Sequence, residues 1–232
     1  MALSRNSNNA GLTGTEILEL KKGLLEDTHL FDGISRSLEA TDITAESLHQ
    51  VGSSTAGLTM ASPICSHMVD PNQLGENYFN KQFDLVIADF DELNCLSPDV
   101  LKNFFATLPG LMAPRGRFIG VFKTRFCIWN LIWRSCTFRF GKLITRLQAE
   151  EKVFEDTEWK YQPARISRLC RKAFVINTIR PVGLLLPPLE LNAIFTNKHE
   201  WLMKLVCLEK KVNSIKPLAG YADYFLIDIQ LK

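Results

Sequence analysis

Residues 83–122 read FDLVIADFDELNCLSPDVLKNFFATLPGLMAPRGRFIGVF, and this stretch decides the fold class. The runs Phe83–Phe90 and Gly116–Lys123 are rich in β-branched and aromatic residues, which is typical of strands. Between them, Pro98–Met112 predicts a helix that is closed by a turn at Ala113–Gly116, with its Pro and Gly. A strand–helix–strand order is the repeating unit of a parallel sheet covered by helices.

The same alternation of strands and helices extends on both sides of this stretch. We expect further strands at Glu16–Leu20, Ser37–Thr41, Phe174–Arg180 and Tyr224–Leu231, and another short strand after the small, polar loop Gly52–Ser62. Helices are expected at Ala45–Gln50 and Ile166–Lys172. The sequence therefore predicts a single α/β domain over residues 15–232, preceded by a disordered lead at residues 1–14.

The composition is that of an ordinary globular protein, with 46% apolar residues, 22% charged residues and a formal net charge of +2. So small a charge gives no broad electrostatic footprint for nucleic acid. The six cysteines include no CxxC pair, which favours reduced, mostly buried thiols and a cytoplasmic location. The N-terminus lacks the apolar core of a signal peptide, and no run of about 18 apolar residues predicts a spanning segment.

Four parts of the sequence carry a family resemblance. They are the block at 83–122, EATDIT at 39–44, the pair ILELKKGLLED at 17–27 and MVDPNQLG at 68–75, and the closing segments IRPVGLLLPP at 179–188 and YADYFLIDI at 221–229. Together they resemble class I S-adenosylmethionine-dependent methyltransferases of the bacterial small-molecule type, over residues 15–232. The resemblance implies a Rossmann-like, seven-stranded, mostly parallel sheet with an antiparallel last strand. It also implies helical cap insertions at about 125–162 and 188–222.

In that fold the cofactor lies across the carboxyl ends of the parallel strands, near the point where strand order reverses. The resemblance implies that Asp42 accepts hydrogen bonds from the ribose hydroxyls and that Asp70 lies near the adenine amino group. Glu19 is expected to orient the first loop or to contact the cofactor's amino group. We expect S-adenosylmethionine as the cofactor, with the contacts Glu19, Lys21, Gly23, Asp42, Ile43, Asp70 and Asp89.

The first loop departs from the family pattern, because Gly23 stands alone where three glycines are usual. Side chains at Lys21 and Leu25 either point into the crevice or force another loop path, since glycine adopts positive φ without strain. Either change predicts weakened cofactor binding. Methyl transfer to a small-molecule acceptor is the leading function. Two alternatives stay open: a degenerate binding or scaffold protein, and a crevice repurposed for chemistry such as cyclisation.

The segment Arg125–Leu143 carries aromatic residues at roughly helical spacing. In related methyltransferases an insertion at this point caps the substrate side, which makes Arg125, Trp129 and Tyr161 candidate contacts of a small apolar or planar substrate. Two other interpretations are a helix packed on the sheet and an amphipathic helix in peripheral contact with a membrane.

No catalytic residue follows from the sequence. An in-line displacement depends on alignment and exclusion of water more than on a base, and Glu92 and Tyr161 are the candidates for deprotonating an acceptor. The short-spaced set Cys65, His67 and Asp70 lacks a fourth ligand, so no metal site is expected. The methyl acceptor and the oligomeric state do not follow from these residues.

Overall fold

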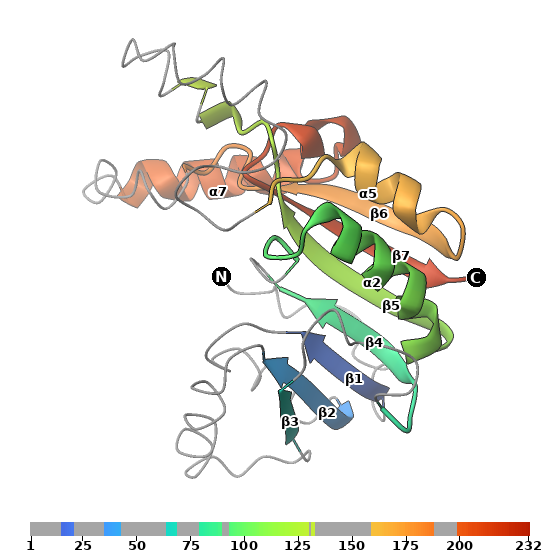
Figure 1. Ribbon diagram of the computed structural model, residues 1–232. Helices are drawn as coiled ribbons and strands as arrows, with labels where there is room; N and C mark the ends of the chain where they lie inside the picture. Colours follow the sequence, from blue (N-terminus) through green and yellow to red (C-terminus); the bar gives the residue numbers. More distant parts are fainter. Residues whose placement is uncertain are drawn as a thin grey trace.

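The computed structural model describes residues 15–20, 35–42, 64–68, 79–89, 93–129, 131–132, 159–187 and 199–232. Their strands form one seven-stranded sheet in the order β3-β2-β1-β4-β5-β7-β6 (Figure 1). The strands are β1 (Thr15–Leu20), β2 (Ser35–Asp42), β3 (Ile64–Met68), β4 (Phe83–Ala88), β5 (Met112–Lys123), β6 (Phe174–Val182) and β7 (Tyr224–Leu231). The Rossmann-like, seven-stranded sheet implied by the resemblance is therefore confirmed.

Strand direction also follows the expected pattern. β3, β2, β1, β4 and β5 pair in parallel, whereas β7 runs antiparallel to both β5 and β6. β7 is the last strand of the chain, yet it lies inside the sheet between β5 and β6, with Phe225 opposite Phe122. The sheet is thus mostly parallel with an antiparallel last strand.

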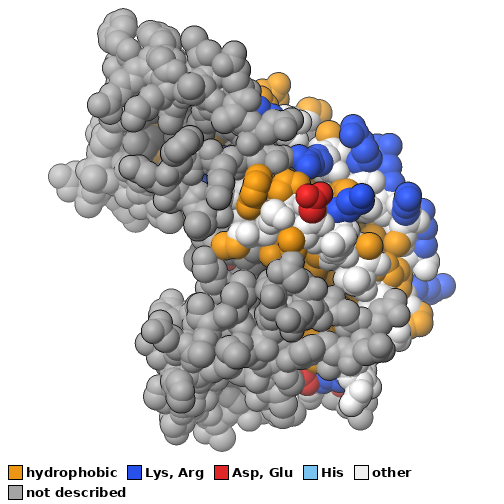
Figure 2. Space-filling view, in the orientation of Figure 1, with side chains coloured by type: hydrophobic (Ala, Val, Ile, Leu, Met, Phe, Trp, Pro, Cys, Tyr) orange, Lys and Arg blue, Asp and Glu red, His pale blue; other side chains and the backbone are white. Residues whose placement is uncertain are grey.

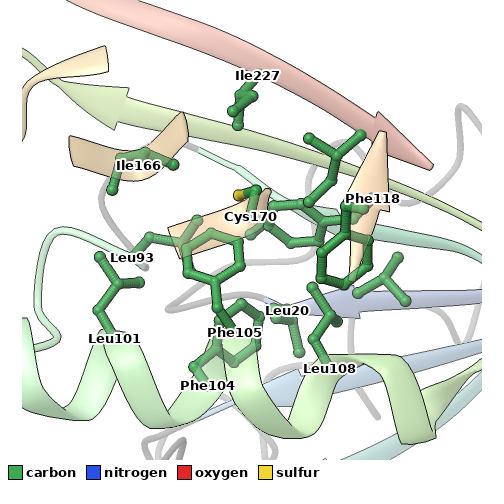
Figure 3. Packing of buried hydrophobic residues seen from close by; sticks show 14 of the residues in the cluster. Leu20, Leu93, Leu101, Phe104, Phe105, Leu108, Phe118, Ile166, Cys170 and Ile227 are labelled. Atoms are coloured by element: carbon green, nitrogen blue, oxygen red, sulfur yellow. The ribbon is translucent and has the colours of Figure 1, made fainter. Parts of the chain in front are cut away.

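Two helices, α2 (Pro98–Leu111) and α5 (Pro163–Cys170), lie together on one face of this sheet (Figure 1). α2 begins where the sequence predicts, because Pro98 suits the first turn and the Ser97 hydroxyl accepts a hydrogen bond from the Val100 N–H. The buried residues of α2 recur at helical spacing and form the centre of the main core (Figure 3): Leu101, Phe104, Phe105, Leu108 and Leu111.

The opposite face of the sheet carries a second, smaller apolar cluster, formed by Ile17, Leu38 and Leu85. Residues 188–222, which the sequence predicts as the second cap insertion, contain helix α7 (His199–Val212) and the 3-10 helix η4 (Lys216–Gly220). Within the described ranges, no helix is both long and apolar enough to cross a membrane.

The turn predicted at Ala113–Gly116 is wrong, because β5 begins at Met112 and these residues form a bulge within it. Phe83 of β4 pairs with Met112, but Leu85 pairs with Arg117, so residues 113–116 of β5 stand opposite a single residue of β4. A bulge of this kind bends the strand without ending it.

The backbone of the bulge explains why its sequence resembles a turn. Arg115 adopts a left-handed φ of 64°. A Cβ on Gly116 would lie 2.8 Å from the Ala113 carbonyl oxygen and 3.0 Å from that of Phe83, so the position accepts glycine alone without a shift.

The helix predicted at Ile166–Lys172 is also displaced, since α5 begins at Pro163 and ends at Cys170. Pro163 occupies the first turn, where its missing N–H leaves no hydrogen bond unmade. A proline therefore marks the start of this helix as well as that of α2.

Candidate functional site

Three acidic positions meet at the carboxyl edge of the parallel strands. Glu19 is the penultimate residue of β1, Asp42 ends β2, and Asp89 directly follows β4. The last residue of β1 pairs with the last residue of β4 and with the penultimate residue of β2, so the three strand ends are level. Strand order reverses between β1 and β4, which is where α/β sheets bind ligands.

Glu19 is 2% exposed, although its side chain is ionisable. In the parallel register Ala40 and Ile87 lie beside it on the two neighbouring strands. A carboxylate in such surroundings is stabilised by hydrogen-bond donors or by a positive charge. Its position therefore suits an ammonium group, or the N–H groups of a loop leaving β1.

Several sequence-based predictions lie outside the described residues. Four of the seven predicted cofactor contacts are among them, together with Leu25, the lead at 1–14, the helix at 45–50, the loop at 52–62 and residues 133–158 of the first cap insertion. The departure of the first loop from the glycine-rich pattern therefore stays a prediction. The four contacts are Lys21, Gly23, Ile43 and Asp70.

Hydrogen bonds tie the carboxyl end of β5 to the segment that precedes β7. The Thr124 N–H donates to the Asp223 carbonyl oxygen over 2.9 Å, and the Ile128 N–H donates to the Tyr221 carbonyl oxygen over 2.9 Å. The Thr124 hydroxyl also donates to the Ala222 carbonyl oxygen. These bonds fix the start of the first cap insertion against the sheet.

Tyr161, a predicted substrate contact, lies in the core below this edge. Its side chain is 1% exposed, and its ring packs edge to face on Phe122 with the centroids 5.8 Å apart. The hydroxyl donates to the Leu96 carbonyl oxygen, while the backbone N–H donates to the Lys123 carbonyl oxygen over 2.9 Å. This placement favours a structural role, in which Tyr161 fastens the loop after β4 to the end of β5.

Asn94 joins the same loop to β5 and was given no role by sequence reasoning. Its side chain is fully buried, and its Oδ1 accepts a hydrogen bond from the Lys123 N–H over 3.0 Å. Its carbonyl oxygen accepts from the Trp159 N–H over 2.5 Å. The sequence offers only an amide beside Leu93 in a loop, which does not distinguish a buried residue from an exposed one.

Arg125 and Trp129, the other two predicted substrate contacts, stand at the start of the first cap insertion. Both are partly exposed. The Arg125 guanidinium carbon lies 5.7 Å from the centre of the Phe126 ring. The Leu131 N–H donates to the carbonyl oxygen of the buried Cys127 over 3.1 Å, so a helical turn begins here. Both side chains are thus positioned just beyond the carboxyl end of β5.

In the part of the chain that the structure describes, no group of three or more His, Cys, Asp or Glu side chains is arranged to hold a metal ion. Cys65 and His67 of the short-spaced set both belong to β3.

Solved structures share this arrangement of strands over almost the whole chain. An S-adenosylmethionine-dependent methyltransferase from Clostridium acetobutylicum aligns with 96% of this chain and 86% of its own, at 13% identity and a TM-score of 0.61. The magnesium protoporphyrin IX methyltransferase ChlM from Synechocystis, with bound SAH, aligns with 97% of this chain and 77% of its own, at 12% identity and a TM-score of 0.60. This chain has the class I methyltransferase fold.

The chain is also similar in structure to a protein that is named for another product. The cyclopropane synthase MmaA2 from Mycobacterium tuberculosis aligns with 95% of this chain and 79% of its own, at 13% identity and a TM-score of 0.59. No protein-family model matches the sequence, and neither does any curated protein. The likeness is therefore one of fold, and the chemistry has to be argued from the residues of the edge.

Proposed function

We propose that this chain transfers a methyl group from S-adenosylmethionine to a small-molecule acceptor. The observation that carries the proposal is the meeting of Glu19, Asp42 and Asp89 at the carboxyl edge, at the strand reversal of a class I methyltransferase fold. S-adenosylmethionine, when bound, supplies an electrophilic methyl group. The chain's own task is to hold the two reactants in line and to keep water away from them.

The residues at this edge fit the polar groups of that cofactor. The nearly buried carboxylate of Glu19 suits an ammonium group, and the short carboxylate of Asp42 at a strand end suits a pair of ribose hydroxyls. A hydrogen bond to a charged acceptor contributes about 1.5 to 3 kcal/mol. By family resemblance, the loop residues complete the site: Lys21, Gly23, Ile43, Asp70 and Asp89.

Arg125 and Trp129 contact the acceptor in this proposal. They stand at the mouth of the first cap insertion, on backbone that is hydrogen-bonded to the segment before β7. Tyr161 supports them from below through its bonds to the loop after β4 and to the end of β5. We assign no base, because alignment of the reacting atoms suffices for an in-line displacement.

Calorimetric titration of the purified chain with S-adenosylmethionine and S-adenosylhomocysteine tests the proposal. Asp42→Ala should weaken binding at least tenfold, since about 1.4 kcal/mol corresponds to a factor of ten. Asp84→Asn is the matched control. Asp84 is an exposed carboxylate at the other end of β4, where it accepts a hydrogen bond from the Glu16 N–H over 2.9 Å. An unchanged dissociation constant for folded Asp42→Ala would remove Asp42 from the site.

The first loop decides how tightly the cofactor binds. If Lys21 and Leu25 occupy positions that need glycine, the native chain should bind in the high micromolar range or worse, because a loss of about 3 to 4 kcal/mol is two to three decades. The double change Lys21→Gly, Leu25→Gly should tighten binding at least tenfold, despite about 0.5 to 1 kcal/mol of backbone entropy per added glycine. Absence of binding in both proteins would reject methyl transfer and favour the degenerate binding or scaffold protein.

A further inference from the structure

Exposed apolar side chains concentrate in the two cap insertions. Seven of the eight large hydrophobic residues that are exposed within the described ranges lie there, and the eighth is Val175 on β6. Single exposed apolar residues are ordinary on a protein surface, but seven of them in two neighbouring insertions indicate an interaction surface.

The first insertion contributes Ile128 and Ile132, which are 39% and 49% exposed and lie one helical turn apart. The Ile128 N–H donates to the carbonyl oxygen of Tyr221, whose side chain is 54% exposed. Exposed apolar side chains from the two insertions therefore lie next to each other, although they are far apart in the sequence.

Helix α7 contributes three of the exposed apolar residues, Trp201, Met203 and Leu208, and it also carries exposed lysines. Trp201 and Leu208 are 40% and 46% exposed and lie seven residues apart, which places them on one side of the helix. Lys204 and Lys211 are exposed and have the same seven-residue spacing. Long lysine stems can reach outward beside inserted apolar groups while the ammonium groups stay in water.

A buried acid anchors α7 about a quarter turn around the helix from Trp201 and Leu208, which fixes the direction in which these side chains face. Glu209 is buried, and its carboxylate accepts hydrogen bonds from the Leu184 N–H over 2.9 Å and the Leu185 N–H over 2.6 Å. An anchored helix cannot turn its exposed residues inward. The Trp201 side of α7 therefore stays at the surface.

Charge indicates what covers this surface. From 199 to 220 the exposed charged residues are four lysines and one glutamate, whereas the second acid of α7 is the buried anchor. Aromatic and aliphatic groups interleaved with lysines are typical of elements that lie in the interface of an anionic lipid bilayer. We propose that the surface formed by α7, η4 and the start of the first cap insertion docks on anionic membrane lipids.

Sedimentation of the full chain with lipid vesicles tests this. We expect binding to vesicles that contain phosphatidylglycerol and much less to phosphatidylcholine alone. The pair Trp201→Glu, Leu208→Glu should weaken binding at least tenfold, and Lys204→Gln with Lys211→Gln about fivefold for each lysine. Val175→Glu introduces one glutamate at a comparably exposed apolar residue outside the caps and should leave vesicle binding unchanged. Circular dichroism of each variant confirms that it is folded.

A second basic surface supplies the decisive comparison. Lys and Arg side chains gather at the end of the molecule where α5 and the C-terminus lie (Figure 2), and Arg168 and Lys172 are exposed there. If Arg168→Gln, Lys172→Gln abolishes vesicle binding while the α7 variants bind normally, the docking surface has been misplaced. Failure of the native chain to bind phosphatidylglycerol vesicles would also overturn the proposal. So would a dimer in sedimentation equilibrium that Trp201→Glu, Leu208→Glu dissociates, because a second copy would then cover this surface.

Discussion

Replacing Tyr161 by phenylalanine separates a structural role from direct contact with substrate. The change removes the hydroxyl that donates to the Leu96 carbonyl oxygen and leaves the ring packed on Phe122. Tyr161 and Leu96 are 1% and 7% exposed, so water cannot readily replace the lost donor. The cost is therefore one buried hydrogen bond together with a carbonyl left unsatisfied, without a large cavity.

The loss of this hydrogen bond should lower the free energy of unfolding by about 1 to 3 kcal/mol. For a chain of this length each kcal/mol lowers the melting temperature by about 2 to 4 °C, so a central value of about 2 kcal/mol predicts a decrease of about 4 to 8 °C. Thermal unfolding followed by circular dichroism measures the shift, and urea unfolding at constant temperature gives the free energy directly.

Tyr221→Phe is the control, because this tyrosine is 54% exposed and its substitution should change the free energy of unfolding by less than about 0.5 kcal/mol. An unaltered free energy of unfolding for Tyr161→Phe, accompanied by weaker binding of the acceptor, would refute the structural role. Tyr161 would then be the substrate contact that the sequence suggested.

Two further predictions concern the amino-terminal edge of the parallel sheet, at Gly116 of β5 and at Lys81, which precedes β4. Gly116→Ala should destabilise the fold by about 1 to 3 kcal/mol in urea, because the added Cβ meets two backbone oxygens, whereas Gly220→Ala should be tolerated, since nothing lies within 4 Å of a Cβ there. Burial lowers the pKa of Lys81, but hydrogen bonds and charges from Glu39 and Glu16 outweigh burial and raise the pKa above the ordinary 10.5. The stabilisation by Lys81 is therefore complete below pH 10.5 and is lost as the pH rises through the folded-state pKa. In urea unfolding, the difference in free energy of unfolding between the native chain and Lys81→Met should become smaller above pH 10.5, and a difference that does not change with pH would contradict this.

The sequence predicts strands well where an apolar pattern continues without interruption. Both ends of β7 were predicted correctly, because Phe225, Ile227 and Ile229 alternate as buried residues along it. The start of β5 was missed for a physical reason. A proline and a glycine form a turn in isolation, and the pairing of Met112 with Phe83, which converts them into a bulge, involves residues far away in the chain.

The candidate site divides in the same way. The family resemblance was enough to predict that Glu19, Asp42 and Asp89 lie at one edge of the sheet. It implies the order of the strands, and the carboxyl ends of neighbouring parallel strands lie at the same edge. The burial of Tyr161 and Asn94 could not be predicted from the sequence. Each bonds to a backbone group that only the folded chain brings near, and neither a tyrosine nor an asparagine shows by its type which environment it occupies.

The position of β7 also determines when the sheet can be completed during synthesis. β5 and β6 emerge from the ribosome first, but they are joined only through β7, which follows both of them in the sequence. Until then each of them presents an unpaired strand edge on which other nascent chains can add. Closure of the sheet therefore waits until Tyr224–Leu231 has been synthesised, and a chain that stops before this strand leaves β5 and β6 unjoined.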